Sequence, residues 1–253
     1  MSDVPQIFDA ELRRRRRRRA ADGFDAFAFL ADAAAGELSE RIAARERAFE
    51  RAAVFGARVP DVQRARWLVR GDSVSGAAGV VYEEDRLPFA TGALDLYASV
   101  LSLHAVNDLP GALAQIRRSL MPGGLFMAAL FGGETLQELR AVLADAEIEI
   151  DGGLSPRVSP FADVRDMGGL LQRAGFAEPV ADVDTLSVRY EHPLKLMGDL
   201  RGMGETNVLS ERRRRFLKRA VLMRASDLYL ERHRGADGRV TATFQILYLT
   251  GKA

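Results

Sequence analysis

The segment from Ala93 to Arg140 constrains the fold most strongly, because two buried strands flank a helix in it. Leu94–Leu103 is a long apolar run without polar alternation, which is typical of a parallel strand covered on both faces. Leu109–Leu120 predicts a helix that ends at Met121-Pro122-Gly123-Gly124, since Pro and Gly follow helix ends. Leu125–Leu130 is the next apolar run. Strand, helix and strand in this order predict a βαβ unit of a parallel sheet.

The same alternation extends along most of the chain, so we predict a doubly wound α/β sheet with helices on both faces. Residues 1–50 are predicted to form a basic and helical extension. Residues 51–253 would form the main domain, with a basic helical insertion at about 191–235. Strands are expected at Ala52–Gly56, Arg66–Arg70, Gly79–Tyr82, Leu186–Arg189 and Arg239–Thr250, and helices at Phe24–Arg51, Glu134–Glu147 and Asp163–Ala174.

Composition excludes several classes of protein. The absence of cysteine rules out disulfides and thiolate metal sites, and only three histidines are present, so no metal is expected. A net charge of +1, from 36 basic and 35 acidic residues, argues against a general nucleic-acid binder. No apolar run approaches the ~20 residues that span a bilayer. We therefore expect a soluble protein of the bacterial cytoplasm, without a transmembrane segment.

Two arginine runs stand out against this balanced charge. Arg13–Arg19 is predicted to be helical and unable to bury its charges, and Arg212–Arg215 lies on another predicted helix. Both are interpreted first as solvated helix faces. The alternative is docking onto an acidic protein surface or RNA.

Motifs along nearly the whole chain carry a resemblance to a known family. The specific ones are SLHAVNDLP at Ser102–Pro110, FGGETLQELR at Phe131–Arg140 and GMGETN at Gly202–Asn207. IFDAELRRR at Ile7–Arg15, GGLSPRVSPF at Gly152–Phe161 and ATFQILYLTGK at Ala242–Lys252 accompany them. By these motifs the chain resembles the mitochondrial complex I assembly methyltransferase-like family and its bacterial relatives, which are class I S-adenosylmethionine-dependent methyltransferases.

The resemblance implies a Rossmann-like fold and a protein substrate. The expected sheet has seven strands, mostly parallel with the last strand antiparallel, and holds its cofactor at the carboxyl ends of the strands. Some family members are described as hydroxylating an arginine on a complex I subunit. The implied partner is therefore a protein client, possibly such a subunit, and the implied cofactor is S-adenosylmethionine.

The cofactor loop expected from the resemblance is eroded in this chain. Class I methyltransferases end their first strand with an acid and a D-x-G-x-G-x-G loop, whose glycines let backbone N–H groups approach the cofactor. In the corresponding stretch from Val54 to Pro60, only Gly56 remains. Val54 cannot accept a hydrogen bond, Arg58 brings a cation towards a cationic sulfonium, and Pro60 has no N–H.

Other cofactor positions suggested by the resemblance are better preserved. Asp72 follows the second strand, where an acid can accept from both ribose hydroxyls. Glu83 follows the third strand, where the family has an acid near the adenine. Ser99 and Ser102 lie at the end of the fourth strand, at the mouth of the crevice. Together with Gly56, these residues form the predicted cofactor site; each acid is alternatively a solvated loop residue.

Candidate catalytic residues follow the fourth and fifth strands and lie in the distal motif. His104 is a candidate general base or substrate-orienting residue, or else a hydrogen-bonded residue that fixes its loop. Because carboxylates grip guanidinium in bidentate fashion, an arginine-modifying site would use Glu134 and Asp199. Glu134 alternatively caps the following helix.

Three functions are compatible with these patterns. The first is an S-adenosylmethionine-dependent enzyme that modifies a protein, by arginine methylation or hydroxylation. The second is a catalytically inactive methyltransferase fold, a pseudoenzyme, that serves as an assembly chaperone or scaffold. The third, an RNA- or ribosome-associated protein, lacks the aromatic residues interleaved with basic ones that single-strand binding usually shows.

Overall fold

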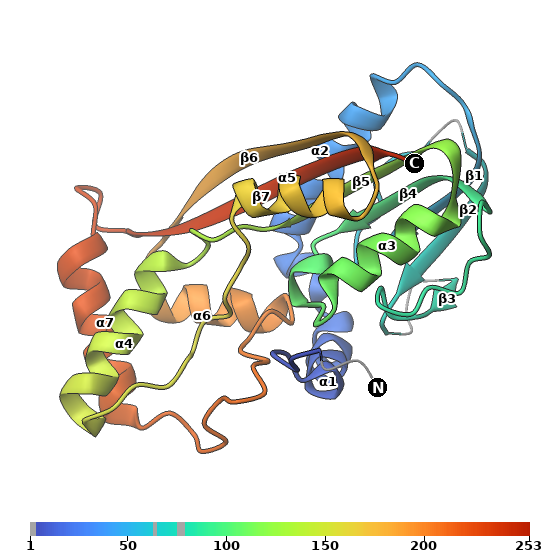
Figure 1. The fold of residues 1–253 in the computed structure, drawn as a ribbon. Coiled ribbons are helices and arrows are strands. Elements are labelled where there is room, and N and C mark those ends of the chain that lie inside the picture. The colour runs from blue at the N-terminus through green and yellow to red at the C-terminus, as the bar shows by residue number, and fades with distance from the viewer. Residues whose placement is uncertain (1–3, 63–64, 75–78) are drawn as a thin grey trace.

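Seven strands form one mixed sheet in the order β3-β2-β1-β4-β5-β7-β6 (Figure 1). The computed structural model describes residues 4–62, 65–74 and 79–253. Strands β1 to β5 pair in parallel, whereas β7 is antiparallel to both β5 and β6. The predicted fold, mostly parallel with an antiparallel last strand, is confirmed. The strands are β1 (Phe49–Phe55), β2 (Ala65–Asp72), β3 (Val80–Val81), β4 (Leu94–Val100), β5 (Leu120–Phe131), β6 (Ala177–Tyr190) and β7 (Val240–Lys252).

Helices cover both faces of the sheet. On one face, α3 (Leu109–Ser119) and α5 (Val164–Arg173) pack on a core that includes Tyr97 and Phe126. On the other face, α2 (Phe29–Ala43) packs on a core that includes Val54. The sheet is therefore buried on both sides, as the continuous apolar strands predicted.

A third group of helices packs near β6 and β7 (Figure 1). It consists of α4 (Gln137–Asp151), α6 (Pro193–Gly202) and α7 (Arg219–His233), and its core includes Tyr229 and Phe244. The last two helices lie within the predicted helical insertion. None of the helices in the described ranges is long and apolar enough to cross a membrane.

Several boundaries differ from the sequence prediction. β1 begins at Phe49, inside the helix predicted to run to Arg51. β6 runs from Ala177 to Tyr190, although only Leu186–Arg189 was expected. Most β6 residues are exposed or half-buried because β6 is an edge strand. Backbone pairing with β7 holds β6 in place, and such pairing requires no apolar run in the sequence. The strand was therefore not apparent from apolar patterns.

One expected turn and one expected helix also differ from the sequence prediction. Met121–Gly124 ends α3 but belongs to β5, where it produces a register shift against β4. Arg212–Arg215 does not form a helix, since it lies in the irregular segment between α6 and α7. Here the arginine spacing suggested a helix that tertiary structure does not form.

The N-terminal arginine run corrects a stronger expectation. It forms α1 (Ala10–Ala21), and the short 3-10 helix η1 (Phe24–Phe27) follows it in the chain. Arg13 and Arg17 on α1 are buried, with 7% and 8% of their surface exposed. The run was expected to keep its charges in water, so the structure must supply partners for these two guanidinium groups.

Gly56 is the one remaining glycine of the eroded loop, and its backbone requires glycine. Its φ is +128°, and a Cβ built there would lie 2.4 Å from the backbone oxygen of Val100. We expect Gly56→Ala to lower the free energy of unfolding by about 2–4 kcal/mol, because a backbone atom must move. Urea denaturation followed by circular dichroism measures this change.

Gly36→Ala is the matched control for that substitution. Gly36 lies in α2, and no atom lies within 4 Å of the Cβ position there. The control is expected to be neutral or to stabilise by up to about 1 kcal/mol, as alanine favours helix. Equal effects of the two substitutions would contradict the requirement for glycine at Gly56.

Candidate functional site

The parallel strands deliver the predicted cofactor residues to one edge of the sheet. Gly56 follows β1 and Asp72 ends β2, and both line a cavity of about 290 Å³. Ser99 and Ser102 are buried at the carboxyl end of β4. Glu83 follows β3 and is half-buried. The structure thus gathers these residues around the carboxyl ends of β1 to β4, as the doubly wound topology requires.

Helix α1 lies against this edge, and its arginines bind the polar groups there. Arg17 Nη2 is 2.9 Å from Asp72 Oδ2, and both side chains are less than a tenth exposed. Arg14 Nη1 is 3.0 Å from Glu83 Oε1. Arg13 Nη2 donates to the backbone oxygen and to the hydroxyl of Ser102, at 3.1 and 3.0 Å.

These contacts decide whether S-adenosylmethionine fits the residues as they are arranged. The ribose would need the Asp72 carboxylate, which Arg17 holds, and the adenine side would meet Glu83, which Arg14 holds. Val54, at the position of the family's acid, is fully buried in the apolar core under α2. With α1 docked, the site therefore does not fit the cofactor.

Arg58 does not place a free cation in the cavity. Its guanidinium lies 2.6 Å from Asp25 Oδ1 and 2.6 Å from Asp32 Oδ1, and it stacks 5.1 Å from the centre of the Phe24 ring. The two carboxylates compensate its charge. The repulsion of a sulfonium that the sequence predicted for Arg58 is therefore weaker than expected.

Glu84, the neighbour of Glu83, is a buried carboxyl that the sequence analysis did not select. Its Oε1 accepts from the Tyr97 hydroxyl at 3.2 Å, and only 2% of its surface is exposed. Burial raises the pKa of Glu84 to about 7, although Ser99, Ser102 and Arg13 nearby oppose this change. Two adjacent glutamates gave no signal in the sequence to show which of them is buried.

The raised pKa of Glu84 predicts a pH dependence of stability. The pKa of Glu84 is ordinarily 4.5, as in the unfolded chain, and about 7 in the folded chain. At a pH between these two values, the folded chain therefore binds more protons at Glu84 than the unfolded chain does. The free energy of unfolding therefore falls as the pH rises through this window. Glu84→Gln removes the titration, so it should stabilise the protein by roughly 1–3 kcal/mol more at about pH 8 than at about pH 5. Urea denaturation of both proteins at both pH values measures this difference, and an equal effect at the two pH values would contradict it.

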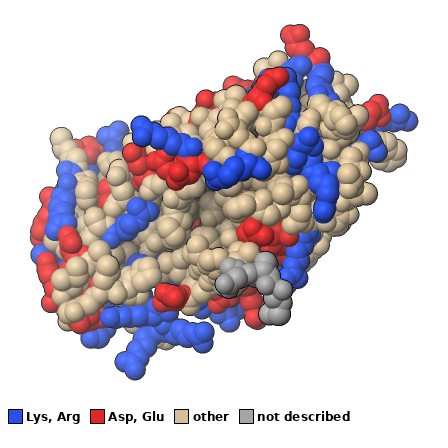
Figure 2. All heavy atoms as spheres, in the orientation of Figure 1, with Lys and Arg blue, Asp and Glu red and all other residues tan. Residues whose placement is uncertain are grey.

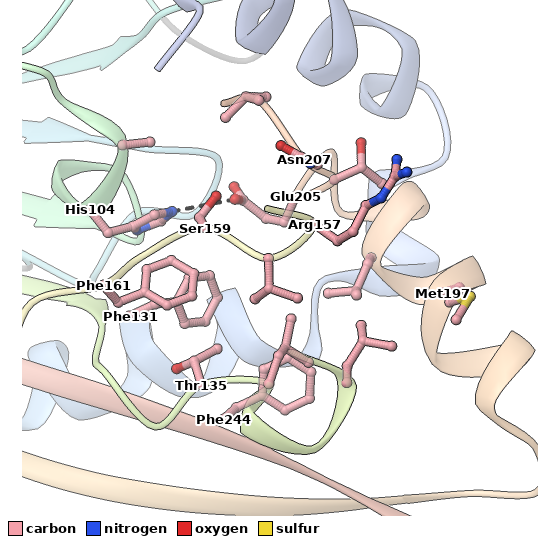
Figure 3. Close-up of a pocket in the computed structure, with 17 residues that line it drawn as sticks. His104, Phe131, Thr135, Arg157, Ser159, Phe161, Met197, Glu205, Asn207 and Phe244 are labelled. Atoms are coloured by element: carbon pink, nitrogen blue, oxygen red, sulfur yellow. Dashed lines mark hydrogen bonds and ion pairs between the residues drawn. The ribbon is translucent and has the colours of Figure 1, made fainter. Parts of the chain in front are cut away.

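A second pocket, of about 140 Å³, lies beyond the end of β5 and holds a hydrogen-bonded pair, His104 and Glu205. His104 Nε2 is 3.3 Å from Glu205 Oε2, and the two side chains are 3% and 24% exposed. Figure 3 shows the two side chains pointing towards one another, with Phe131 and Phe161 beside them. The His104 ring lies 4.8 Å from the Phe131 ring and 5.7 Å from the Phe161 ring, measured between centres. The walls of the pocket are mostly apolar and aromatic.

The electrostatics of this pair favour an ionised carboxylate and a neutral imidazole. Burial lowers the pKa of His104, and the hydrogen bond that His104 donates to Glu205 opposes that change only in part. Burial would raise the pKa of Glu205, but the hydrogen bond and charge of His104, with Arg13 and Arg17, lower it overall. Near neutral pH Glu205 therefore carries a negative charge, and no Lys or Arg among the described residues forms a salt bridge with it.

The structure does not bring all three predicted catalytic residues together. Of these, His104 lines the pocket, whereas Glu134 is exposed on the turn before α4. Asp199 is half-buried on α6, and its charge helps burial to raise the pKa of Tyr190. The acid that meets His104 is Glu205, which the sequence analysis missed although GMGETN contains it. The motif was the available signal, but no spacing showed which of its residues faces the pocket.

A narrow cavity of about 30 Å³ lies between the two larger ones. It shares Phe131 and Glu205 with the His104 pocket, and Arg17 and Met203 with the cavity beside Asp72. The two sites therefore adjoin one another. Among the described residues, no group of three or more His, Asp or Glu side chains is placed to hold a metal ion.

Comparisons with known proteins agree with this architecture. The sequence model described as a methyltransferase domain matches residues 35–128. The YcgJ protein of Bacillus subtilis has a solved structure that superposes with a TM-score of 0.54 at 12% identity, over 85% of this chain and 97% of that one. At such low identity, the likeness shows the fold alone.

Two curated relatives carry the same name, mitochondrial arginine-hydroxylase NDUFAF5. The protein of Mus musculus is 39% identical over 264 residues, which cover 97% of this chain and 77% of the mouse protein. The protein of Danio rerio is 44% identical over 191 residues, which cover 76% of this chain but only 59% of the zebrafish protein. Because nearly the whole chain aligns with the mouse protein and has the class I methyltransferase fold, it belongs to the NDUFAF5 family.

Proposed function

We propose that this chain binds an arginine side chain of a protein client in the pocket that holds His104 and Glu205. The observation that carries the proposal is the position of the Glu205 carboxylate among mostly apolar and aromatic walls, held by a hydrogen bond from His104. A guanidinium group is planar, permanently charged and suited to carboxylate geometry, and its apolar stem suits aromatic walls. The proposal accounts for a half-buried carboxylate whose direct hydrogen-bond partner is a neutral imidazole rather than a cation.

His104 acts in this proposal as a positioning residue. Its Nε2–H donates to Glu205, so its Nδ1 is an unprotonated acceptor. Nδ1 is buried and has no hydrogen-bond partner within the described residues. The imidazole fixes the carboxylate without neutralising it, because a protonated His104 would compete with the incoming guanidinium.

The relatives' name supports the same substrate class, since both are arginine hydroxylases. We therefore propose that the substrate or ligand of this chain is an arginine within a protein. The client suggested by the family resemblance is a complex I subunit. S-adenosylmethionine is the cofactor that the fold implies, although Arg14 and Arg17 of α1 hold the acids that it would need. The location in the bacterial cytoplasm stays a prediction.

Isothermal titration with short peptides tests the arginine pocket. The probe is a blocked pentapeptide with one central arginine between glycines, and the control peptide carries citrulline in its place. Citrulline has nearly the same shape but no charge, so we expect it to bind at least about 30-fold more weakly. Equal affinity for both peptides, or no binding of either, would overturn the proposal.

A second candidate function, a scaffold that holds its client without modifying it, is favoured by a specific observation. Asp72 and Glu83 are paired with arginines of α1 rather than open to a cofactor. Both functions use the same arginine pocket. Mass spectrometry of a client incubated with the protein and S-adenosylmethionine distinguishes a methyltransferase from a scaffold, because only methyl transfer changes the mass of the client under these conditions.

The charge distribution gives less support to an RNA-associated function. Figure 2 shows Lys and Arg side chains interspersed with Asp and Glu over the visible face. Of the N-terminal run, Arg13 and Arg17 are buried and so do not reach a phosphate backbone. Arg212 and Arg213 of the second run pair with Asp9 and Asp151.

A further inference from the structure

We propose that α1 is an internal occupant of the adenosyl side of the cofactor pocket, so that a docked α1 and an adenosyl ligand exclude one another. The proposal concerns the cavity beside Asp72 and does not depend on the arginine pocket. Displacement of α1 would convert the closed site into one that can accept the ligand.

Helix α1 and an adenosyl ligand would need the same acceptor atoms on the protein. Asp72 Oδ2 accepts from Arg17, and Asp72 Oδ1 lies 3.3 Å from both the Ser73 hydroxyl and the Val74 backbone nitrogen. A ribose diol would hydrogen-bond to this carboxylate. Glu83 Oε1 is likewise held by Arg14. The α1 side chains thus satisfy two acids on neighbouring strands that a nucleoside would otherwise reach.

The buried arginines of α1 are incompletely compensated, which favours release of the helix. Arg13 and Arg17 are one helical turn apart and both buried, and burial followed by the charge of Arg17 lowers the pKa of Arg13. Arg13 Nε has no hydrogen-bond partner among the described residues. Arg17 pairs with a buried carboxylate, Asp72, whereas Arg13 bonds, within the described ranges, only to the backbone oxygen and hydroxyl of Ser102, so a part of its desolvation cost is not recovered.

The apolar anchor of α1 is small in comparison. Phe8 and Leu12 pack with Val208 and Leu209 in a cluster separate from the main cores. α1 therefore contributes little apolar surface to its docking, and removal of one partner of the Arg17–Asp72 pair should favour its release. This balance distinguishes α1 from α2, whose Leu38 and Ile42 belong to the main core of the sheet.

Limited digestion of the full chain with trypsin reports whether α1 is docked. Cleavage within Arg13–Arg19 requires the helix to detach and unwind, and mass spectrometry follows the resulting peptides. Arg45 and Arg47 lie exposed in the turn between α2 and β1 and serve as the internal reference. We expect Asp72→Asn to accelerate cleavage in α1 about tenfold or more relative to this reference. Glu83→Gln is the matched control. The side chains of Glu83 and Arg14 are 26% and 38% exposed, so their pair should contribute less to the docking of α1.

Binding of S-adenosylhomocysteine provides the second measurement. The apparent affinity of a ligand falls with the fraction of protein in the competent state, so Arg17→Met should bind it about tenfold or more tightly than the unaltered chain. Methionine keeps much of the apolar stem of arginine, and circular dichroism checks that the variant folds. If it does not fold, Arg14→Gln replaces it, with a smaller gain in affinity expected.

The outcomes separate cleanly. Faster cleavage in α1 when S-adenosylhomocysteine is bound, or tighter binding by the variants, supports mutual exclusion. Binding to the unaltered chain while α1 keeps or increases its protection would overturn the proposal. Failure of the folded variants to bind more tightly than the unaltered chain would overturn it too.

Discussion

Glu205→Gln is expected to weaken binding of the arginine peptide by about 30-fold or more, with little change in stability. Glutamine keeps the shape of the side chain and can still accept from His104, but it loses the charge that faces the guanidinium. Losing one partner of a buried, hydrogen-bonded charge pair costs about 2–5 kcal/mol in binding. The arginine peptide should then bind Glu205→Gln about as weakly as citrulline binds the unaltered chain. Isothermal titration measures both.

Glu134→Gln and Asp199→Asn are the controls, because the sequence assigned the guanidinium to these carboxylates. Glu134 is exposed, and neither side chain is among the described residues that line the pocket. Each variant should bind the arginine peptide within about twofold of the unaltered chain. A large loss in either control together with an unaffected Glu205→Gln would transfer the proposed role back to that residue.

Glu147→Gln is expected to destabilise the fold by about 3–5 kcal/mol, the largest effect on stability among the changes considered. Glu147 lies on α4 and is fully buried. Its Oε2 accepts from the Ser155 backbone nitrogen at 2.7 Å, and its Oε1 accepts from Arg157 Nε at 2.8 Å and from Arg157 Nη2. The substitution leaves a guanidinium that is largely buried and has lost its counter-charge. Urea denaturation measures the free energy of unfolding.

The same helix supplies the control. Glu149, two residues along α4, pairs with Arg224 on the exposed surface, where solvent screens the interaction. Glu149→Gln should leave the denaturation midpoint unchanged within error. Because Arg157 lines the arginine pocket, Glu147→Gln should also weaken binding of the arginine peptide, whereas Glu149→Gln should leave that binding unchanged. Equal effects of the two substitutions would contradict a special role for the buried pair.

The strand and helix order was predictable because it depends on short-range patterns. Continuous apolar runs such as Leu94–Leu103 belong to strands covered on both faces, and that pattern is written in consecutive residues. The edge strand β6 was mostly missed for the same reason. Its residues are largely exposed, and it is defined by pairing with β7 rather than by its own apolar content.

At the eroded loop, the sequence shows which residues are replaced, and the structure shows what the replacements contact. The sequence alone shows that Val54 and Arg58 replace an acid and a glycine. Only the structure shows that Val54 packs under α2 and that Asp25 and Asp32 compensate Arg58. The chemistry of a substituted residue depends on its neighbours, and those neighbours come from another part of the chain.

The sequence by itself thus determined the α/β fold, its family and the edge of the sheet where the functional residues gather. The tertiary structure decided which polar side chains meet: Arg17 with Asp72 as a buried ion pair, and His104 with Glu205 as a hydrogen-bonded pair. A run of arginines on a short helix is usually solvated, because an unpaired guanidinium is costly to bury. It can be buried only where the fold brings a carboxylate from a distant strand, and no local pattern records that meeting.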